Sequence, residues 1–301
     1  MQSLIDLHMH STASDGKDSP AALLEKIKSL GIRCFALTDH DTIDGVREME
    51  QALVSDGSAD IVFIRGIEFS CITSAGKCHI LGYGYDWDND AFQAVLAKSA
   101  ALRRRKLEQR MDFLRKEYQI EFSEDDIEKM RGMKSVGKPH LAELMIKMGL
   151  VGSVAEGIDK YIDHCPTLDS RMPADEVIHA IRSSNGISVW AHPRGGVGER
   201  ARSDEEFQAQ LKHLTDCGLQ GLECFYSRYS REEVEKLAAC AMEHGLCISG
   251  GSDYHGRKKY PPIGTLNADG VSVDAKQLSV LQGCDAAFGE NEAKKKQGST
   301  T

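Results

Sequence analysis

Two histidines, His8 and His10, end a short apolar run near the N-terminus, and Asp15 follows five residues later. Because side chains at i and i+2 of a strand point to the same face, both imidazoles project together from the end of this strand. Two histidines on one face beside a carboxylate make up most of a divalent-metal site. The spacing therefore predicts metal chemistry at the first strand.

The same residue types recur after other apolar runs along the chain. The further candidates are His40, Glu68, His79, His192, Asp253 and His255. Six imidazoles and three carboxylates are too many for one tetrahedral structural zinc, and they suit two or three clustered divalent ions. Ions about 3.5–4 Å apart polarise a phosphoryl oxygen, activate a bridging water and steady the leaving oxygen, so the set predicts phosphoryl chemistry. A ligand set of nitrogen and oxygen atoms is compatible with manganese, iron or zinc, so it does not identify the metal.

The elements that position these residues alternate between strand-like runs and segments of helical period. We expect strands at Leu4–His10, Cys34–His40, Ile61–Phe69, Cys78–Tyr85, Ile187–Ala191, Leu219–Phe225 and Cys247–Ser252. We expect helices from Ser19-Pro20 to Leu30 and at Asp44–Leu53, Ala174–Ser184, Phe207–Thr215 and Arg231–His244. Such alternation favours parallel strands joined by crossover helices, with the active site at the carboxyl ends of the strands.

The sequence between the strands expected at Cys78–Tyr85 and Ile187–Ala191 has a different pattern. It predicts helices only, at Ala91–Tyr118, Ser123–Met130, Pro139–Met148 and Ser153–Ile162. We therefore expect residues 1–88 and 166–270 to form one discontinuous α/β domain, with residues 89–165 as an α-helical insert over its mouth. Residues 271–301 form a C-terminal tail with a short helix near Ala275–Leu281, and Ala293–Thr301 is expected to be disordered.

The composition limits the partners and the compartment. A formal net charge of −9 argues against a broad surface for long duplex nucleic acid but not against a small anionic substrate. The nine cysteines are scattered and lack a Cys-x-x-Cys pair, which favours a reducing compartment. The first strand begins at once and no apolar run is long enough for a bilayer, so we expect a cytoplasmic protein without a signal peptide or membrane contact.

Six motifs together carry a family resemblance. They are Asp6-Leu7-His8-Met9-His10-Ser11 with Asp15-Gly16, Leu37-Thr38-Asp39-His40-Asp41-Thr42, Gly66-Ile67-Glu68, His79-Ile80-Leu81-Gly82-Tyr83, Ala191-His192-Pro193, and Gly251-Ser252-Asp253-Tyr254-His255-Gly256. The chain resembles the PHP (polymerase and histidinol phosphatase) superfamily of metal-dependent phosphoesterases. The resemblance implies a distorted, TIM-like seven-stranded β/α barrel with a trinuclear metal centre.

Mapped onto this chain, the resemblance also implies ligand sets. One ion would lie on His8, His10, Glu68 and Asp253, a second on Glu68, His79 and His192, and a third on Asp15, His40 and His255. Glu68 would bridge the first two ions. Glu68, His192, His255 and Asp15 are the residues that we expect to act in catalysis.

The helical insert narrows the resemblance to one subgroup. Its motif Gly137-Lys138-Pro139-His140-Leu141-Ala142 is similar to that of stand-alone enzymes acting on 5′- or 3′-phosphorylated nucleotides, some of which trim short RNAs from the 5′ end. The subgroup has arginine where this chain has Lys138. Lysine keeps the positive charge but cannot bind a phosphate through two parallel N–H donors as a guanidinium does. Arg103, Lys106 and Arg110 share one helix face and form a possible phosphate clamp. The predicted substrate-binding residues are Lys138, His140, Arg103 and Arg110.

These observations predict an enzyme, a metal-dependent phosphoric monoester hydrolase acting on AMP or 3′,5′-nucleoside bisphosphates. Because the chain has neither a Gly-x-Ser-x-Gly elbow nor a Cys–His signature, the expected nucleophile is a metal-bound hydroxide. One alternative is a 5′→3′ exonuclease on short single-stranded RNA or oligonucleotides. Two others are a histidinol-phosphate phosphatase and a non-catalytic metal-binding module. The partner expected is a nucleotide or short oligonucleotide.

Overall fold

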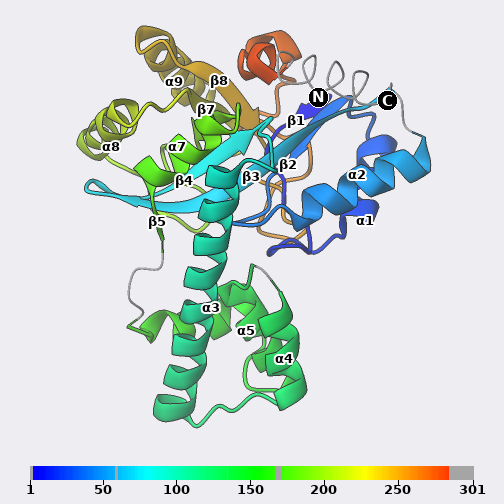
Figure 1. The fold of residues 1–301 in the computed structure, drawn as a ribbon, viewed down its shortest axis with the longest axis vertical. Coiled ribbons are helices and arrows are strands. Elements are labelled where there is room, and N and C mark those ends of the chain that lie inside the picture. Colours follow the sequence, from blue (N-terminus) through cyan, green and yellow to red (C-terminus); the bar gives the residue numbers. More distant parts are fainter. Residues whose placement is uncertain (1–2, 58–59, 134, 167–170, 285–301) are drawn as a thin grey trace.

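The computed structural model describes residues 3–57, 60–133, 135–166 and 171–284. Seven strands pair in the order β1-β2-β3-β4-β6-β7-β8 and curve into a barrel (Figure 1). Their bounds are β1 Ile5–Asp6, β2 Cys34–Leu37, β3 Val62–Thr73, β4 Gly76–Tyr83, β6 Ile187–Trp190, β7 Gly221–Tyr226 and β8 Cys247–Gly251. The predicted α/β fold with a seven-stranded barrel is confirmed.

The segment that continues from β1 closes the barrel against β8. Leu7 N donates to Gly250 O at 3.2 Å, and Asp253 N donates to His8 O at 2.8 Å. Beyond these bonds, Met9 forms a parallel bridge with Tyr254. The first strand is thus shorter than Leu4–His10, but its continuation still pairs with the last strand.

Strand β4 departs from the parallel arrangement that strand–helix alternation predicts, as the turn-like sequence Thr73-Ser74-Ala75-Gly76 before it indicates. β1, β2 and β3 are parallel, as are β6, β7 and β8, but β4 is antiparallel to β3 and to β6. The reason is the two-residue turn between Thr73 and Gly76, which is too short for a crossover. Gly76 has a φ of 125°, a conformation that favours glycine. A two-residue strand without a sequence signal, β5 (Met172–Pro173), pairs with β3.

The predicted helices that alternate with the strands all form. They are α1 Pro20–Ser29, α2 Asp44–Asp56, α7 Ala174–Ser183, α8 Asp204–Asp216 and α9 Arg231–Glu243. The Ser19 hydroxyl accepts a bond from Ala22 N and caps α1, which buries Leu23 and Ile27. Full burial of such a side chain contributes about 1.5–3 kcal/mol. The apolar face of α1 therefore fixes the helix against the first strands.

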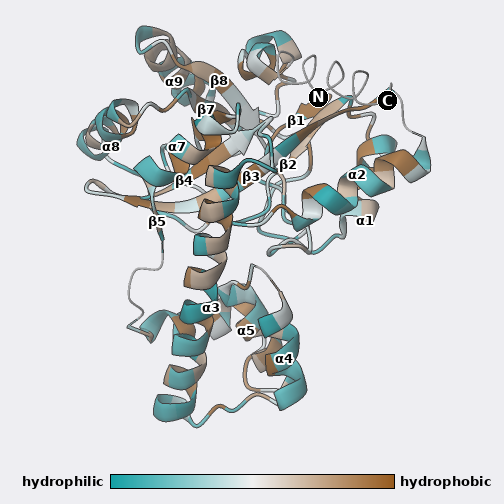
Figure 2. Ribbon diagram, in the orientation of Figure 1, coloured by the Kyte–Doolittle hydropathy of each residue, from teal (hydrophilic) through white to brown (hydrophobic). Residues whose placement is uncertain are grey.

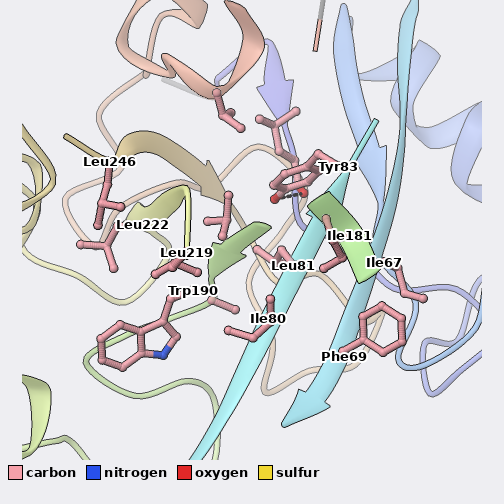
Figure 3. Close-up of a cluster of buried hydrophobic side chains, with 14 of the residues drawn as sticks. Ile67, Phe69, Ile80, Leu81, Tyr83, Ile181, Trp190, Leu219, Leu222 and Leu246 are labelled. Atoms are coloured by element: carbon pink, nitrogen blue, oxygen red, sulfur yellow. Dashed lines mark hydrogen bonds between the residues drawn. The ribbon is translucent and has the colours of Figure 1, made fainter. Parts of the chain in front are cut away.

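Hydrophobic residues recur along the strands and alternate with hydrophilic ones along the helices (Figure 2), and many of those in the strands are buried. Figure 3 shows Tyr83, Ile181 and Trp190 in the large buried cluster. A Cβ on Gly82 would lie 3.1 Å from both Ile181 and Ile67, so glycine lets α7 pack closely on β3 and β4. The barrel is therefore a filled core, and its polar residues gather at one end.

The segment between β4 and β5 is helical and has its own apolar cluster. It comprises α3 Asp90–Tyr118, α4 Glu124–Gly132, α5 Lys138–Lys147, α6 Val154–Lys160 and a short 3-10 turn at Ile162–His164. The long α3 leads away from the barrel to α4 and α5 (Figure 1). Leu107, Leu114 and Leu141 are buried in a cluster separate from the barrel core. The exact boundaries of the insert, 89–165, stay a prediction.

The end of the described chain is only partly helical. A 3-10 turn at Ala275–Gln277 and a helical stretch at 280–284 replace the single helix expected near Ala275–Leu281. The prediction for Ala293–Thr301 lies outside the described residues. Among the described helices, none is long and apolar enough to span a membrane.

Candidate metal centre

All nine predicted ligand residues converge at one end of the barrel. Those that lie in strands are Glu68 on β3 and His79 on β4; those that follow strands are His8, His10 and Asp15 after β1, His40 after β2, His192 after β6, and Asp253 and His255 after β8. The loops after parallel strands meet at the same end of a barrel, and the reversed β4 reaches this end with its first half. The structure therefore brings together residues more than 240 positions apart in the sequence.

Glu68 lies at the centre of this group. Its Oε2 is 3.3 Å from His8 Nε2, 3.1 Å from His10 Nε2 and 3.2 Å from His40 Nδ1, and its Oε1 is 3.0 Å from both His79 Nδ1 and His192 Nε2. A carboxylate surrounded by five imidazoles in this way has the geometry of a bridging ligand.

Two aspartates complete the group. Asp253 Oδ1 lies 3.6 Å from His8 Nε2, 3.4 Å from His10 Nε2 and 3.4 Å from His255 Nδ1. Asp15 Oδ1 lies 3.3 Å from His255 Nε2 and 3.8 Å from His10 Nδ1. Four overlapping sets could each hold a cation: His8-His10-Glu68, His10-Asp15-His40-His255, His40-Glu68-His79 and His79-His192-Glu199.

Several buried imidazole nitrogens form no hydrogen bond of ordinary geometry with any described residue, although carboxylate oxygens lie nearby. These atoms are His8 Nε2, both ring nitrogens of His10, His40 Nδ1 and His192 Nδ1. An unsatisfied buried polar atom costs about 1–3 kcal/mol, so natural proteins rarely keep five in one place. Divalent cations would satisfy these nitrogens. The donor set therefore fits metal ions, and the clusters are able to bind them.

Electrostatics favour the ligating protonation states of the carboxylates. Burial opposes ionisation of Glu68, yet the nearby His40, His79 and His8 hold its pKa well below the usual value. Burial likewise opposes ionisation of Asp253, but His255 and the first two histidines lower its pKa. Burial lowers the pKa of His40 to about 3. Burial also opposes protonation of His8, His10 and His192, but the carboxylates beside these rings raise their pKa values. Ionised carboxylates and a neutral imidazole are the forms that bind metal.

A further carboxylate, Glu223 of β7, orients two of the candidate ligands. Its Oε1 lies 2.9 Å from His8 Nδ1, and its Oε2 accepts a bond from His192 N at 2.7 Å. A carboxylate on the second ring nitrogen fixes the tautomer of a metal-ligating histidine. The sequence analysis missed Glu223, although a single acidic residue inside a buried strand was an available signal.

Glu199 is a second residue that the sequence did not reveal. Its Oε2 lies 3.3 Å from His192 Nδ1 and accepts a bond from Gly196 N at 2.9 Å. It lies in the loop after Pro193, where nothing distinguishes it from an ordinary surface glutamate.

Backbone strain also concentrates around these residues. Asp41, His192 and Asp253 have φ values of 55°, 29° and 59°, which side chains other than glycine rarely adopt. Each such residue costs about 1–3 kcal/mol, and such strain is typical of functional sites. Asp41 is held by bonds from Ser70 N and Ser99 Oγ and by an ion pair with Arg103. Asp41 therefore links the loop of His40 to α3 through hydrogen bonds, and it forms none with an imidazole of the described residues.

The candidate substrate-binding residues divide into two groups. Arg103, Arg110 and Lys138 line a cleft of about 390 Å3 that also includes Asp15, His40 and His79. His140 instead accepts a bond from Gly137 N at 3.0 Å and closes the first turn of α5. Lys138 forms an ion pair with Asp163, and Arg103 pairs with Asp41. The predicted cationic face of α3 thus borders the cleft, with part of its charge already neutralised.

Comparisons with known proteins agree with this geometry. Residues 6–118, which include six of the nine candidate ligands, match the PHP domain. The chain is 27% identical over 274 residues to the 5′-3′ exoribonuclease Rnm of Escherichia coli strain K12, covering 87% of this chain and 91% of that protein.

Two other similar proteins come from different bacteria. The 3′,5′-nucleoside bisphosphate phosphatase of Chromobacterium violaceum is 28% identical over 257 residues, which cover 83% of this chain and 87% of that protein. A crystal structure from Bifidobacterium adolescentis, provisionally assigned as a metal-dependent phosphoesterase, is similar with a TM-score of 0.73 and 26% identity. It covers 90% of this chain and 97% of the other.

Proposed function

Because this chain belongs to the PHP family of metal-dependent phosphoesterases, we propose that it hydrolyses phosphate monoesters of nucleotides, of the AMP or 3′,5′-nucleoside bisphosphate type. The observation that carries the proposal is the group of imidazoles around the Glu68 carboxylate, which borders a cationic cleft. The imidazole and carboxylate atoms would bind the metal ions that promote phosphate hydrolysis. The cationic side chains of the cleft would attract an anionic nucleotide. The similarity to a nucleoside bisphosphate phosphatase supports the same substrate class.

The metal ligands that we propose are those of the sequence analysis. Two to three ions of manganese, iron or zinc would be held by His8, His10, Asp15, His40, Glu68, His79, His192, Asp253 and His255. Divalent ions bound there would polarise the phosphoryl group and lower the pKa of a coordinated water. Glu223 would fix the ring of His8, and the cleft residues Arg103 and Arg110 would orient the substrate phosphate.

A 5′→3′ exonuclease activity on short single strands is the second candidate. The observation in its favour is the similarity to an exoribonuclease over 87% of this chain. The cleft is also bordered on one side by α3 and α5, so a strand could lie between the insert and the barrel. Either activity has a small anionic partner, a nucleotide or a short oligonucleotide.

The nine cysteines, all in the described part of the chain, form no disulfide, which supports a cytoplasmic location.

One incubation series separates the two candidates. The manganese-loaded protein is given adenosine 3′,5′-bisphosphate, AMP or a 5′-phosphorylated trinucleotide, and phosphate and mononucleotide release are measured. Phosphate from the small nucleotides supports the phosphatase, and mononucleotides from the trinucleotide support the exonuclease. A chelated sample and the Glu68→Gln variant must both be silent, which excludes a contaminating enzyme. No product from any substrate would contradict both candidates.

A further inference from the structure

The loop after β1 and the loop after β8 are joined by hydrogen bonds beside the metal centre. Lys17 N donates to His255 O at 3.0 Å, and the Tyr254 hydroxyl donates to Asp18 Oδ2 at 2.6 Å. These loops carry the predicted ligands Asp15 and His255, whose Oδ1 and Nε2 atoms lie 3.3 Å apart. The bonds between the loops therefore hold these two ligands together.

Arg257, in the loop after β8, adds a direct contact to one of these ligand residues. Its Nε and Nη2 donate to Asp15 O at 3.3 and 3.2 Å. The Arg257 side chain is only 12% exposed, so these bonds are largely shielded from water. A guanidinium that donates two N–H groups to one carbonyl fixes the direction of the backbone there. Because the Asp15 carboxylate projects from this backbone, Arg257 also restricts where the carboxylate can lie.

The same guanidinium reaches the helical insert. Arg257 Nη1 donates to Glu143 Oε1 on α5 at 2.7 Å. The first turn of α5 is also close to the ligand loop, because burial lowers the pKa of His140 while the carboxylates of Asp15 and Glu143 act in the opposite direction. One side chain thus contacts the loop of a predicted metal ligand and a helix of the insert at once.

A side chain with this pair of contacts links two equilibria. When α5 lies against the barrel, Glu143 holds Arg257 in the position from which it fixes the Asp15 loop. A seated insert then favours metal binding at Asp15. By thermodynamic linkage, bound metal must favour the seated insert by the same factor. The contact is therefore expected to act in both directions.

We propose that Arg257 is a positioning residue that couples the seating of the helical insert to metal binding by His10, Asp15, His40 and His255. This inference rests on the proposed metal ligands and deepens the proposed function, since it adds a means by which the insert controls the same site. Arg257 itself donates to a backbone carbonyl and to Glu143, and it is not one of the ligands.

The first measurement is the affinity of Arg257→Met for manganese, by metal analysis and competition with a chelator. Methionine removes all the N–H donors but keeps an unbranched side chain. We expect one bound ion to be held roughly ten- to a hundredfold more weakly, the usual effect of losing a group that orients a metal ligand, and the other ions to keep their affinities. Arg231→Met, which removes a surface arginine paired with Glu235 on α9, is the matched control.

Hydrogen exchange of α5 measures the coupling in the other direction. In the unmodified protein, manganese should slow exchange of the α5 amides more than exchange of the α9 amides, which serve as an internal reference. In Glu143→Gln the bonds from Arg257 to Asp15 can remain, but the ion pair to α5 is lost. The extra protection of α5 should then shrink, and the affinity for one ion should fall by about two- to fivefold, the effect of a partly exposed ion pair. Glu235→Gln should leave both quantities unchanged.

The outcomes separate this inference from the proposed function. An unmodified protein that binds no manganese contradicts both. If the unmodified protein and Arg257→Met bind manganese with equal affinity, or if Arg257→Met loses every ion, the coupling is wrong and the proposed function is untouched. The loss of one ion together with the extra protection of α5 supports the coupling. If Arg257→Met does not fold, Glu143→Gln decides, and an unchanged metal affinity with unchanged protection of α5 overturns the inference.

Discussion

The Glu68 carboxylate contacts five imidazoles from four parts of the barrel. Glu68→Gln keeps the shape of the side chain but removes the charge and turns an NH2 group toward nitrogens that need a cation or a proton. We expect the variant to lose more than one bound metal ion and at least a hundredfold in kcat, more than the roughly ten- to hundredfold typical of outer-shell changes. Metal analysis and p-nitrophenyl phosphate hydrolysis measure this. Glu128→Gln, on an exposed helix surface, is the control.

The Glu223→Gln variant tests the role of Glu223, which is not one of the nine predicted metal ligands but contacts two of them, His8 and His192. The amide keeps one acceptor, so it can serve either His8 Nδ1 or His192 N but not both in their present geometry. We expect a roughly ten- to hundredfold loss of metal affinity, measured by competition with a chelator. Glu235→Gln on the surface of α9 should change nothing. Equal affinities for both variants would mean that Glu223 does not position these ligands.

Candidate metal ligands are easier to recognise in the sequence than the residues that orient them through hydrogen bonds. His8 and His10 are recognisable because the two-residue period of a strand places them on one face. Glu223 stands out only as an acidic residue in a buried strand, because its contacts come from residues far away in the chain. Glu223 reaches His8 across 215 positions, a pairing set only by closure of the barrel. Lys138 was expected to grip phosphate but pairs with Asp163, which lies in a different element.

At the level of elements, the ion pair between Arg103 and Asp41 joins α3 to the loop of His40. The Asp41 side chain is 1% exposed and that of Arg103 is 16% exposed, so removal of the cation leaves a buried charge without a partner. We expect Arg103→Met to destabilise the protein by about 3–5 kcal/mol in urea unfolding. Arg115→Met, which breaks a surface pair on the same helix, should cost about 1 kcal/mol or less.

A double variant checks the cause of this loss. Asp41→Asn added to Arg103→Met removes the stranded charge, so part of the lost stability should return. If the double variant is less stable than Arg103→Met by the full cost of Asp41→Asn alone, the two residues are not coupled.

Elements with local sequence signals were easier to predict than elements that exist through tertiary pairing. The start of α1 follows from Ser19 and Pro20, and the turn-like residues Thr73-Ser74-Ala75-Gly76 mark the reversal from β3 to β4. By contrast, β5 is only two residues long and exists through its pairing with β3. Contacts of that kind are set by tertiary packing and leave little trace in the local sequence.

At the scale of the whole molecule, the barrel brings together a set of ligands that is poorly satisfied without metal. The chain ends that close the barrel carry ligands on both sides of the closure, because His8 and Asp253 are linked through the bond from Asp253 N to His8 O. Metal bound to this set therefore stabilises the seam between the first and last strands as well as the site. Binding to the folded state alone adds about 2.7 kcal/mol when the free metal is at a hundred times its Kd.

Chelation should consequently lower the melting temperature. For a chain of this size, a loss of about 2.7 kcal/mol corresponds to a shift of roughly 4–5 °C. Differential scanning calorimetry of the metal-loaded and chelated protein measures the shift, and added manganese should reverse it. In Glu68→Gln the shift should be much smaller, because the central ligand is missing. If chelation leaves the melting temperature unchanged in a sample shown to lose its metal, then the ligand end of the barrel folds independently of the ions.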